Sequence, residues 1–377
     1  MIRAEARVDL DAVRANLAVL RAAAGDAEVM AVVKADGYGH GMVPVARAAR
    51  SAGAGWLGVA FPGEALALRA AGDTGRVLAW LITPHDDVAP CVAADVDLSV
   101  SAPWAVDLVA AAADRAGRPA RVHLKVDTGL GRGGGSLADW PALVDRARRH
   151  EAGGALELVG VWSHLANGEV ADDPETAAQQ ERFAWALAEA ERAGLRPQVR
   201  HLANSGATLA VPGARFDLVR CGIAMYGLTP GLALGTSASL GLRPAMTLRA
   251  EVALAKRVPA GHGVSYGLTW TAPAETTLAL VPVGYGDGIP RAASGSGPVL
   301  VGGRIRHVVG RVAMDQCVVD VGDDAVAAGD PVVLFGPGDD GEPTAEDWAI
   351  ACGTIGYEIV TRLGPRVPRR YVGEDAR

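Results

Sequence analysis

Short apolar runs rich in Val, Ile and Leu alternate with Ala-rich segments of helical periodicity from about residue 10 to residue 235. Consecutive parallel strands need long crossover connections, and they are apolar throughout because helices cover both faces of the sheet. Eight apolar runs can be counted, at 28–34, 56–60, 77–82, 97–101, 121–127, 158–164, 199–204 and 216–221. Helical segments lie between them, for example at 62–71, 103–117, 137–150 and 175–194. This α/β pattern predicts a (β/α)8 TIM barrel.

The chain changes character beyond about residue 240, where the helical periodicity ends and short strands alternate with Gly and Pro turns. These features predict a second, mainly antiparallel β domain. Its expected strands are at 246–258, 277–283, 299–309, 316–321 and 331–335, with a single helix at 344–352. The Gly-containing and Ser-containing segment 229–241 is the expected linker. The predicted domains are therefore 1–240 and 241–377.

Charge and composition narrow the classes of partner. The net charge is −7, and no basic stripe interleaved with aromatic residues is present, so we expect no nucleic-acid partner. No apolar stretch reaches the ~18 residues of a membrane helix, and the N-terminus lacks a signal-peptide core, so we expect a cytoplasmic protein without a membrane partner. The four cysteines are scattered without Cys-x-x-Cys spacing, which predicts neither disulfides nor a metal site.

Lysine is nearly absent from this chain. Lys34, Lys125 and Lys256 are the only lysines, so 33 of the 36 basic residues are arginine. A lysine amine can become neutral and nucleophilic, whereas a guanidinium keeps its proton. Lys34 and Lys125 lie at the ends of predicted strands, and each is therefore a candidate chemical group. Lys256 precedes an arginine in a predicted β strand and is interpreted as a solvated surface residue.

Polar residues gather where the predicted barrel strands end. The active site of a TIM barrel is built at the carboxyl ends of its strands, so a polar side chain there indicates function. The residues in these positions are Lys34, Lys125 followed by Arg132, His164, Asn204 with Ser205, and Arg220. His40 and His201 are expected to serve loop packing or phosphate binding rather than catalysis.

A phosphate site is expected after the seventh and eighth strands. Ser205 and the backbone of Gly222 and Ile223 follow these strands, where barrels commonly bind phosphate. A lysine on strand one facing such a pocket suggests a pyridoxal phosphate enzyme in which Lys34 forms the Schiff base. Burial near Arg220 would lower the pKa of this amine.

The sequence Ala-Val-Val-Lys-Ala-Asp-Gly-Tyr-Gly-His-Gly at 31–41 closely resembles the pyridoxal phosphate attachment motif of bacterial alanine racemases. The likeness spans nearly the whole chain and continues through 125–132, 201–205, 220–227, 263–267 and 312–315. It implies a fold-type III enzyme that interconverts L-alanine and D-alanine, supplies D-alanine for peptidoglycan, and forms a head-to-tail homodimer. In that family the β domain of one subunit completes the active site of the other.

The resemblance implies two bases acting on opposite faces of the substrate. Lys34 holds the cofactor as an internal aldimine and acts on one face, and Tyr266 acts on the other. Arg132 and a hydrogen-bond chain from Tyr266 through His164 to Arg220 would support the phenol. Arg220 also faces the pyridine nitrogen, which would stay unprotonated because a guanidinium does not give up its proton.

The resemblance also implies how cofactor and substrate are bound. The further cofactor positions are Tyr38, His164, Asn204, Ser205, Gly222, Ile223 and Tyr357. Arg132, Met314 and Asp315 match the substrate site. Lys125 corresponds to a lysine that is carbamylated in several relatives and then orients Arg132. The substrate channel would be lined by Tyr285, Arg291, Arg311 and Ile355.

Three other functions compete with this interpretation. A broader racemase acting on serine or larger amino acids would share the fold and the site. A barrel decarboxylase with the same cofactor should carry a catalytic cysteine and a different partner for the pyridine nitrogen, so Arg220 argues against it. A non-enzymatic pyridoxal phosphate carrier on the same barrel would lack the second domain that bears Tyr266.

Overall fold

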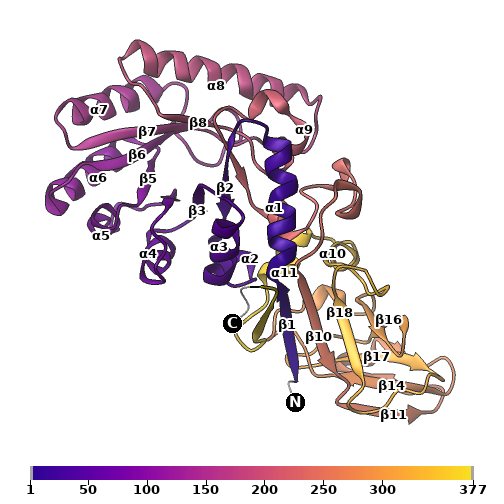
Figure 1. Ribbon diagram of the computed structural model, residues 1–377. Coiled ribbons are helices and arrows are strands. Elements are labelled where there is room, and N and C mark those ends of the chain that lie inside the picture. The colour runs from indigo at the N-terminus through magenta and orange to yellow at the C-terminus, as the bar shows by residue number, and fades with distance from the viewer. Residues whose placement is uncertain (1–2, 375–377) are drawn as a thin grey trace.

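The computed structural model describes residues 3–374 and divides into a barrel and a β domain. Figure 1 shows the barrel, with its helices on the outside, above and to the left of the β domain. Within the described part of the chain, no helix is long and apolar enough to cross a membrane. All four cysteines are free.

Eight parallel strands form the barrel, in the order β8-β7-β6-β5-β4-β3-β2-β9. They are β2 (Glu28–Val32), β3 (Trp56–Val59), β4 (Arg76–Ala79), β5 (Asp97–Val100), β6 (Ala120–Lys125), β7 (Leu156–Trp162), β8 (Val199–His201) and β9 (Leu218–Cys221). The terminal strands are joined by main-chain hydrogen bonds from Asp217 N to Arg200 O at 3.1 Å and from Arg220 N to Ala203 O at 3.0 Å. The barrel predicted from the alternation of apolar runs is confirmed.

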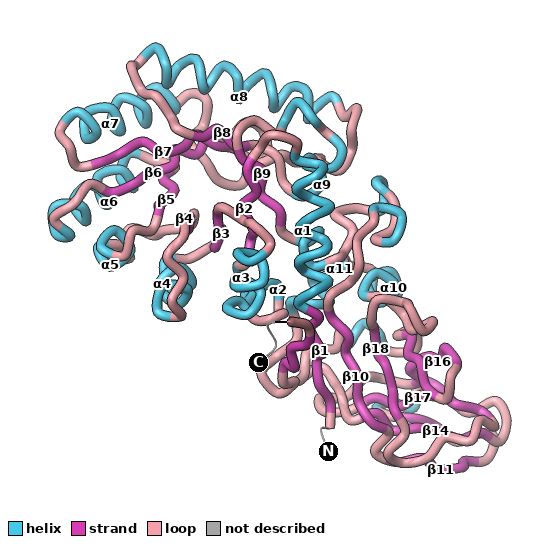
Figure 2. Tube along the Cα trace, in the orientation of Figure 1, coloured by secondary structure: helices cyan, strands magenta, loops and turns pink. Residues whose placement is uncertain are grey.

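Helices cover the outside of the barrel (Figure 2). They are α1 (Leu10–Ala24), α3 (Met42–Ser51), α4 (Pro62–Ala70), α5 (Ala89–Ala93), α6 (Pro103–Ala116), α7 (Trp140–Ala152), α8 (Pro174–Arg192) and the short α9 (Ser205–Ala210). Local sequence sets their ends. Asp173 caps α8 by accepting a hydrogen bond from Thr176 N at 2.8 Å, and Gly117 ends α6 in the left-handed conformation. The buried faces of these helices pack on the strands and form one continuous core.

The β domain contains a nine-stranded sheet in the order β11-β14-β17-β16-β15-β18-β10-β1-β19. After β1, its strands are β10 (Met246–Glu251), β11 (Leu254–Val258), β14 (Thr276–Val281), β15 (Pro298–Val301), β16 (Arg304–Val309), β17 (Cys317–Gly322), β18 (Pro331–Phe335) and β19 (Arg369–Val372). A small ladder joins β12 (Gly263–Val264) to β13 (Trp270–Thr271). The second domain of the predicted fold is confirmed.

Several details of the β domain differ from the sequence prediction. The expected strand 299–309 is a hairpin, because Gly302 and Gly303 turn the chain at φ values of 59° and 72°. The expected strand 246–258 is divided into β10 and β11. The expected helix is present as α10 (Ala345–Cys352), but a second helix, α11 (Gly356–Thr361), follows it and was not predicted. Its six residues are too few to show the periodic pattern of apolar residues that predicts a helix.

The first strand, β1 (Ala4–Asp9), pairs antiparallel with β10 and parallel with β19. The assignment of residues 1–240 to the barrel was therefore wrong at its N-terminal end. Alternate residues Ala4, Ala6 and Val8 are buried, as expected for a strand with one face on a core. The chain thus begins in the β domain, builds the barrel, and returns through the linker.

Asn16 ties helix α1 to the segment that leads back to the β domain. Its amide nitrogen donates to Met225 O at 3.2 Å and to Arg243 O at 2.8 Å, and its amide oxygen accepts from Arg243 N at 2.8 Å. Gly227 lies at φ 84°, and a Cβ there would come within 1.8 Å of Arg243 O. The junction therefore depends on a buried amide and on a glycine that permits close backbone contact.

Replacing Asn16 with leucine should lower the free energy of unfolding by about 2–4 kcal/mol, because three buried main-chain groups lose their partners. Urea denaturation followed by circular dichroism measures this change. Ala22→Ser, on the exposed side of the same helix, is the matched control and should stay within about 0.5 kcal/mol. A loss below about 1 kcal/mol for the leucine variant would contradict the proposed anchor.

Candidate active site

Lys34 follows strand β2 and begins a tight left-handed turn, labelled α2 (Lys34–Tyr38). Ala35, Asp36 and Tyr38 adopt φ values of 54°, 52° and 51°, which non-glycine residues rarely do. Two hydrogen bonds to side chains help to hold the turn, in addition to its main-chain hydrogen bonds. Ala35 N donates to Glu64 Oε1 at 2.7 Å, and Met42 N donates to Asp36 Oδ1 at 2.8 Å. Such strain is maintained where the surrounding structure fixes a functional group.

The Lys34 amine lies at the inner end of this turn, partly buried between aromatic rings. Its Nζ is 5.7 Å from the ring centre of Trp80 and 6.0 Å from that of Tyr38. Burial lowers the pKa of Lys34, and the charge of Arg132 lowers it further, while Glu64 opposes the shift. A larger neutral fraction makes the amine a better nucleophile.

A cradle of backbone and hydroxyl groups faces the turn at the ends of β8 and β9. Gly222 N donates to Ser205 Oγ at 2.9 Å, and a Cβ on Gly222 would lie only 2.4 Å from Tyr38 Oη. Asn204 caps α9 by accepting from Ala207 N at 3.0 Å, so its side chain positions Ser205. Ile223 follows directly in a 3-10 turn. Backbone N–H groups and hydroxyls in this arrangement suit a phosphate.

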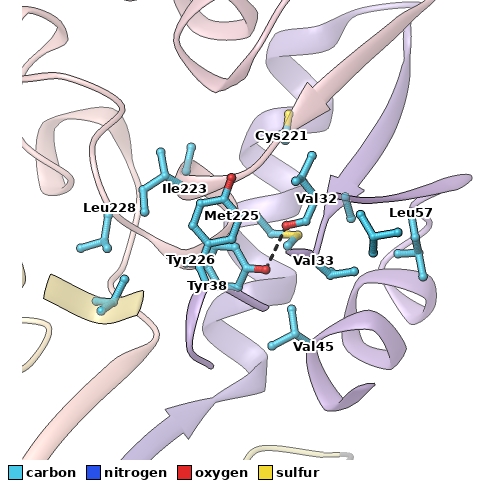
Figure 3. Close-up of a cluster of buried hydrophobic side chains, with 14 of the residues drawn as sticks. Val32, Val33, Tyr38, Val45, Leu57, Cys221, Ile223, Met225, Tyr226 and Leu228 are labelled. Carbon is cyan, nitrogen blue, oxygen red and sulfur yellow. Dashed lines mark hydrogen bonds between the residues drawn. The ribbon is translucent and has the colours of Figure 1, made fainter. Parts of the chain in front are cut away.

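Aromatic packing fixes Tyr38 against the cradle. Its ring centre is 4.9 Å from that of Tyr226 and 6.3 Å from that of Tyr357. Tyr226 Oη donates to Val32 O at 3.0 Å, which anchors the stack to strand β2 (Figure 3). Burial raises the pKa of the Tyr38 phenol, so it remains a neutral hydrogen-bond donor. Tyr357 comes from α11, which brings the β domain of the same chain to this side of the site.

Arg220 is buried in the barrel and makes its hydrogen bonds to uncharged acceptors. Nη2 donates to Ser163 O at 2.8 Å and Leu202 O at 3.0 Å and contacts His164 Nδ1 at 3.1 Å. Nη1 contacts His201 Nδ1 at 3.2 Å. Burial lowers the pKa of Arg220 to about 9, so the guanidinium is charged at neutral pH.

Positive charge concentrates around this mouth of the barrel. Burial lowers the pKa of Lys125 to about 8, with contributions from Arg220, Arg132 and Lys34, while Asp127 opposes the shift. The pKa of His164 is held well below its usual value by burial and then by the same cations. His164 is therefore neutral, and its Nδ1 accepts from Arg220. An excess of cations over carboxylates suits an anionic ligand.

Trp162 is a site residue that the sequence analysis missed. Its ring centre lies 4.5 Å from Lys125 Nζ and 4.7 Å from Arg220 Cζ, and the ring stacks on His201 at 5.4 Å. The available signal was its position at the end of the sixth predicted strand, two residues before His164. His201 was expected to serve loop packing or phosphate binding, but it lies inside the barrel against Arg220.

The β-domain residues implied by the resemblance gather on a separate, exposed face. Ser265 Oγ donates to Arg311 O at 2.6 Å, and Tyr285 N donates to Ala313 O at 3.0 Å. Tyr266 is 71% exposed and Met314 is 52% exposed. We define the tyrosine face as the residues Ser265, Tyr266, Tyr285, Arg311, Ala313 and Met314. Among residues 3–374, no hydrogen bond joins it to Lys34 or Arg220.

The other implied residues lie around these two regions. Asp315, beside Met314, pairs with Arg366 at 2.7 Å. Arg291 is exposed at the start of a 3-10 turn, and Ile355 is exposed at the start of α11. Arg132 is exposed in the loop after strand β6. In the described part of the chain, no cluster of His, Cys, Asp or Glu is arranged to hold a metal ion.

Sequence models of the two domains of alanine racemases match this chain. The model described as the N-terminal domain matches residues 8–230, and the C-terminal domain model matches residues 245–371. The chain belongs to the alanine racemase family. Members of this family are amino-acid racemases, and the chain is accordingly an enzyme of that class.

Relatives in the alanine racemase family match over almost the full length. The alanine racemase of Frankia casuarinae is 62% identical over 371 residues, covering 98% of this chain and 97% of the relative. A solved alanine racemase from D-cycloserine-producing Streptomyces lavendulae is 57% identical with a TM-score of 0.98, covering 99% and 98% of the two chains. A solved alanine racemase from Bacillus anthracis with bound L-Ala-P is 36% identical with a TM-score of 0.91, covering 100% and 96%.

The lowered pKa of Lys125 makes its amine reactive near neutral pH. We expect the initial rate of arylation by trinitrobenzenesulfonate to rise with pH and to reach half its maximal value near pH 8, because the neutral amine is the reacting form. Peptide mass spectrometry across a pH series measures this rate. Asp127→Asn should move the midpoint to lower pH, since the Asp127 charge stabilises the ammonium form. A midpoint above pH 10 would contradict the assignment.

Proposed function

We propose that this chain is a pyridoxal phosphate-dependent alanine racemase that interconverts L-alanine and D-alanine. The observation that carries the proposal is the Lys34 amine, held in a strained turn opposite the Ser205 and Gly222 cradle. The B. anthracis relative with bound L-Ala-P supports an alanine-sized ligand at this site. A broader racemase acting on serine is the alternative within the class.

The residues present fit the cofactor. A Cβ at Gly222 would fill the cradle, and Ser205 Oγ with the adjoining N–H groups suits a phosphate. Lys34 is the amine available to the aldehyde. Pyridoxal phosphate, when bound, supplies the electron sink that makes the α-proton of an amino acid acidic. Arg220 would hold the pyridine nitrogen with a charged donor that keeps its own proton.

We propose that two residues exchange the α-proton from opposite faces of the substrate. Lys34 Nζ acts on one face and Tyr266 Oη on the other, because a single base would return the proton to the face it came from. Free tyrosine is a poor base, with a pKa near ~10. Arg132 would supply positive charge near the phenol, and neutral His164, whose Nδ1 accepts from Arg220, would link the phenol to that guanidinium.

We further propose a head-to-tail homodimer with shared sites. Tyr266 and Met314 are exposed, and within residues 3–374 neither forms a hydrogen bond with Lys34, so Tyr266 of the partner subunit would complete each site. Arg311 and Tyr285 lie on the same tyrosine face and would narrow the channel. Arg132 with the Met314 N–H would bind the substrate carboxylate, and a carbamylated Lys125 would orient Arg132.

The enzyme is proposed to work in the cytoplasm and to supply D-alanine for peptidoglycan. Four free cysteines, three of them buried, support a reducing compartment. Burial raises the pKa of Cys221 to about 12, although the hydrogen bond to Thr208 and the charge of Arg220 oppose the shift, so this thiol is unreactive there.

Borohydride reduction of the purified protein should trap the cofactor on Lys34, as identified by peptide mapping. Tyr266→Phe should lower racemisation by about 10²–10⁴-fold, because one proton-transfer group is lost, while cofactor absorption is retained. Lys34→Ala is the matched variant and should lose covalent trapping. A trapped adduct at another lysine, or a colourless protein after incubation with pyridoxal phosphate, would refute the proposal.

Mixed dimers test the shared site. Lys34→Ala and Tyr266→Phe chains with different affinity tags should each be nearly inactive as homodimers. A purified heterodimer has one site with both Lys34 and Tyr266 intact, so about half of the unsubstituted activity should return. If each site were built within one chain, the heterodimer would remain inactive. Mixing Lys34→Ala with Lys34→Ala chains is the control.

A further inference from the structure

A line of four buried polar side chains runs through the barrel interior beneath the proposed site. Asp97 begins strand β5, His123 lies within β6, His201 ends β8, and Arg220 lies on β9. Each is no more than 5% exposed. The interior of an eight-stranded barrel is usually filled with branched apolar side chains, so this line requires an explanation. We refer to Asp97, His123 and His201 as the relay.

Each member of the line is within hydrogen-bond distance of the next. Arg220 Nη1 is 3.2 Å from His201 Nδ1. His201 Nε2 is 2.9 Å from His123 Nδ1, and His123 Nε2 is 3.2 Å from Asp97 Oδ2. The line therefore connects the guanidinium at the mouth of the barrel to a carboxylate at the amino end of strand β5.

Only one arrangement of protons satisfies every contact. Arg220 can only donate, so His201 Nδ1 must accept and the His201 proton must be on Nε2. That proton is donated to His123 Nδ1, which leaves the His123 proton on Nε2, pointing at Asp97. The carboxylate accepts at the end of the line. Both rings are thus neutral and protonated on Nε2, and all donors point away from Arg220.

The charges around the rings agree with this arrangement. Burial and the charge of Arg220 lower the pKa of His201 well below its usual value. Burial also lowers the pKa of His123, although Asp97 opposes the shift. Burial acts to raise the pKa of Asp97, but the hydrogen bond from His123 and the charges of Arg76 and Arg121 lower it to about 2. Asp97 is ionised at neutral pH.

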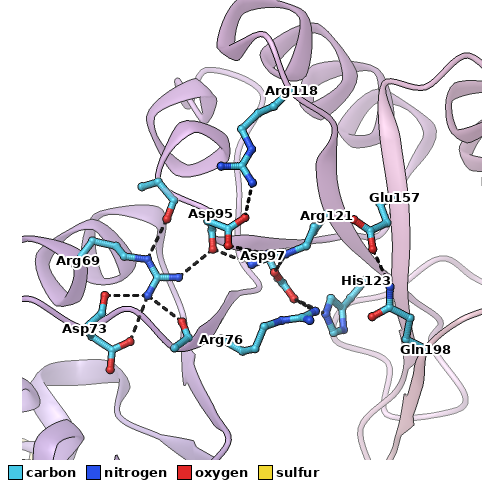
Figure 4. Close-up of polar contacts among 12 residues, drawn as sticks. Arg69, Asp73, Arg76, Asp95, Asp97, Arg118, Arg121, His123, Glu157 and Gln198 are labelled. Atoms are coloured by element: carbon cyan, nitrogen blue, oxygen red, sulfur yellow. Dashed lines mark hydrogen bonds and ion pairs between the residues drawn. The ribbon is translucent and has the colours of Figure 1, made fainter.

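Neighbouring residues pack closely around the relay and restrict the movement of its side chains. His201 stacks on Trp162 with an interplanar angle of 4°, and His123 packs edge-on against Trp56. A Cβ at Gly160 would lie 2.3 Å from His123 Nδ1, so glycine leaves the room that this ring occupies. Arg76 and Arg121 bind Asp97 from outside (Figure 4). A rigid ring in a fixed tautomer is what orients a partner group with precision.

We propose that Asp97, His123 and His201 are positioning residues that fix the orientation of the Arg220 guanidinium toward the bound cofactor while leaving its charge uncompensated there. A carboxylate in direct contact would neutralise Arg220 next to the ring. Two neutral imidazole rings instead connect Arg220 to Asp97 through hydrogen bonds that all point in one direction. The Asp97 carboxylate therefore stays at the far end of the barrel. This inference deepens the proposed function and rests on it.

The proton arrangement can be measured directly. Protein labelled with ¹⁵N-histidine, with its cofactor bound, should give long-range ¹H–¹⁵N correlations for two neutral, Nε2-protonated rings at neutral pH. Spectra of His123→Gln and His201→Gln assign the two signals. A ring protonated on Nδ1, or a cationic ring, at either position would overturn the proposal.

The positioning role is tested at His123, which does not contact Arg220. His123→Leu cuts the relay and should lower kcat by about tenfold or more with KM changed less than about threefold. It should also shift the absorption band of the bound cofactor before substrate is added. His123→Gln retains one acceptor and one donor on its amide and should restore both kcat and the band.

Val159→Ala is the matched control, because Val159 belongs to the apolar cluster that fills the same barrel interior. It should lower the melting temperature without moving the absorption band. If folded His123→Leu behaves like Val159→Ala in kcat and spectrum, the relay is only structural and the proposal fails. If His123→Leu does not fold, the measurement of the histidine tautomers decides whether the proposal holds. A protein that never binds pyridoxal phosphate would refute the proposed function, yet its histidine tautomers could still be observed.

Discussion

The buried guanidinium of Arg220 is the interaction on which the site depends. Burying a cation is costly unless its N–H groups are hydrogen-bonded, and here the carbonyl oxygens of Ser163 and Leu202 and the rings of His164 and His201 lie within hydrogen-bond distance of Nη1 and Nη2. These acceptors come from the ends of two neighbouring strands. The arrangement of strands that closes the barrel therefore also fixes the position of the cation.

Much of the fold could be predicted from the sequence, because eight apolar runs separated by helical periods allow few other architectures. Strand β1 could not, because its six residues include Glu5, Arg7 and Asp9 and form no apolar run, and because its partners, β10 and β19, lie more than 200 residues away in the chain. Helix α11 was too short to show a period. Both misses involve elements whose existence depends on tertiary contacts rather than on local sequence.

Some residues of the candidate site could also be predicted from the sequence, and others could not. Lys34, His164 and Arg220 could be recognised as site residues because they lie at the ends of predicted strands, where a barrel concentrates its functional polar groups. The motifs of a known family were needed for Tyr266, which by itself is an ordinary exposed aromatic residue. Nothing in the sequence linked Asp97 to His201, since hydrogen bonds across a barrel join residues with no fixed spacing. Their connection exists only in the folded barrel, which brings these side chains together.

The position of β1 has a consequence for how the protein is made. During synthesis the first strand leaves the ribosome long before either neighbour exists, because β10 begins at Met246 and β19 at Arg369. The barrel can close while this segment is still an unpaired edge, and the nine-stranded sheet can be completed only after β19 has been synthesised. Strands β1 and β19 thus pair last, and their pairing completes the domain that bears Tyr266.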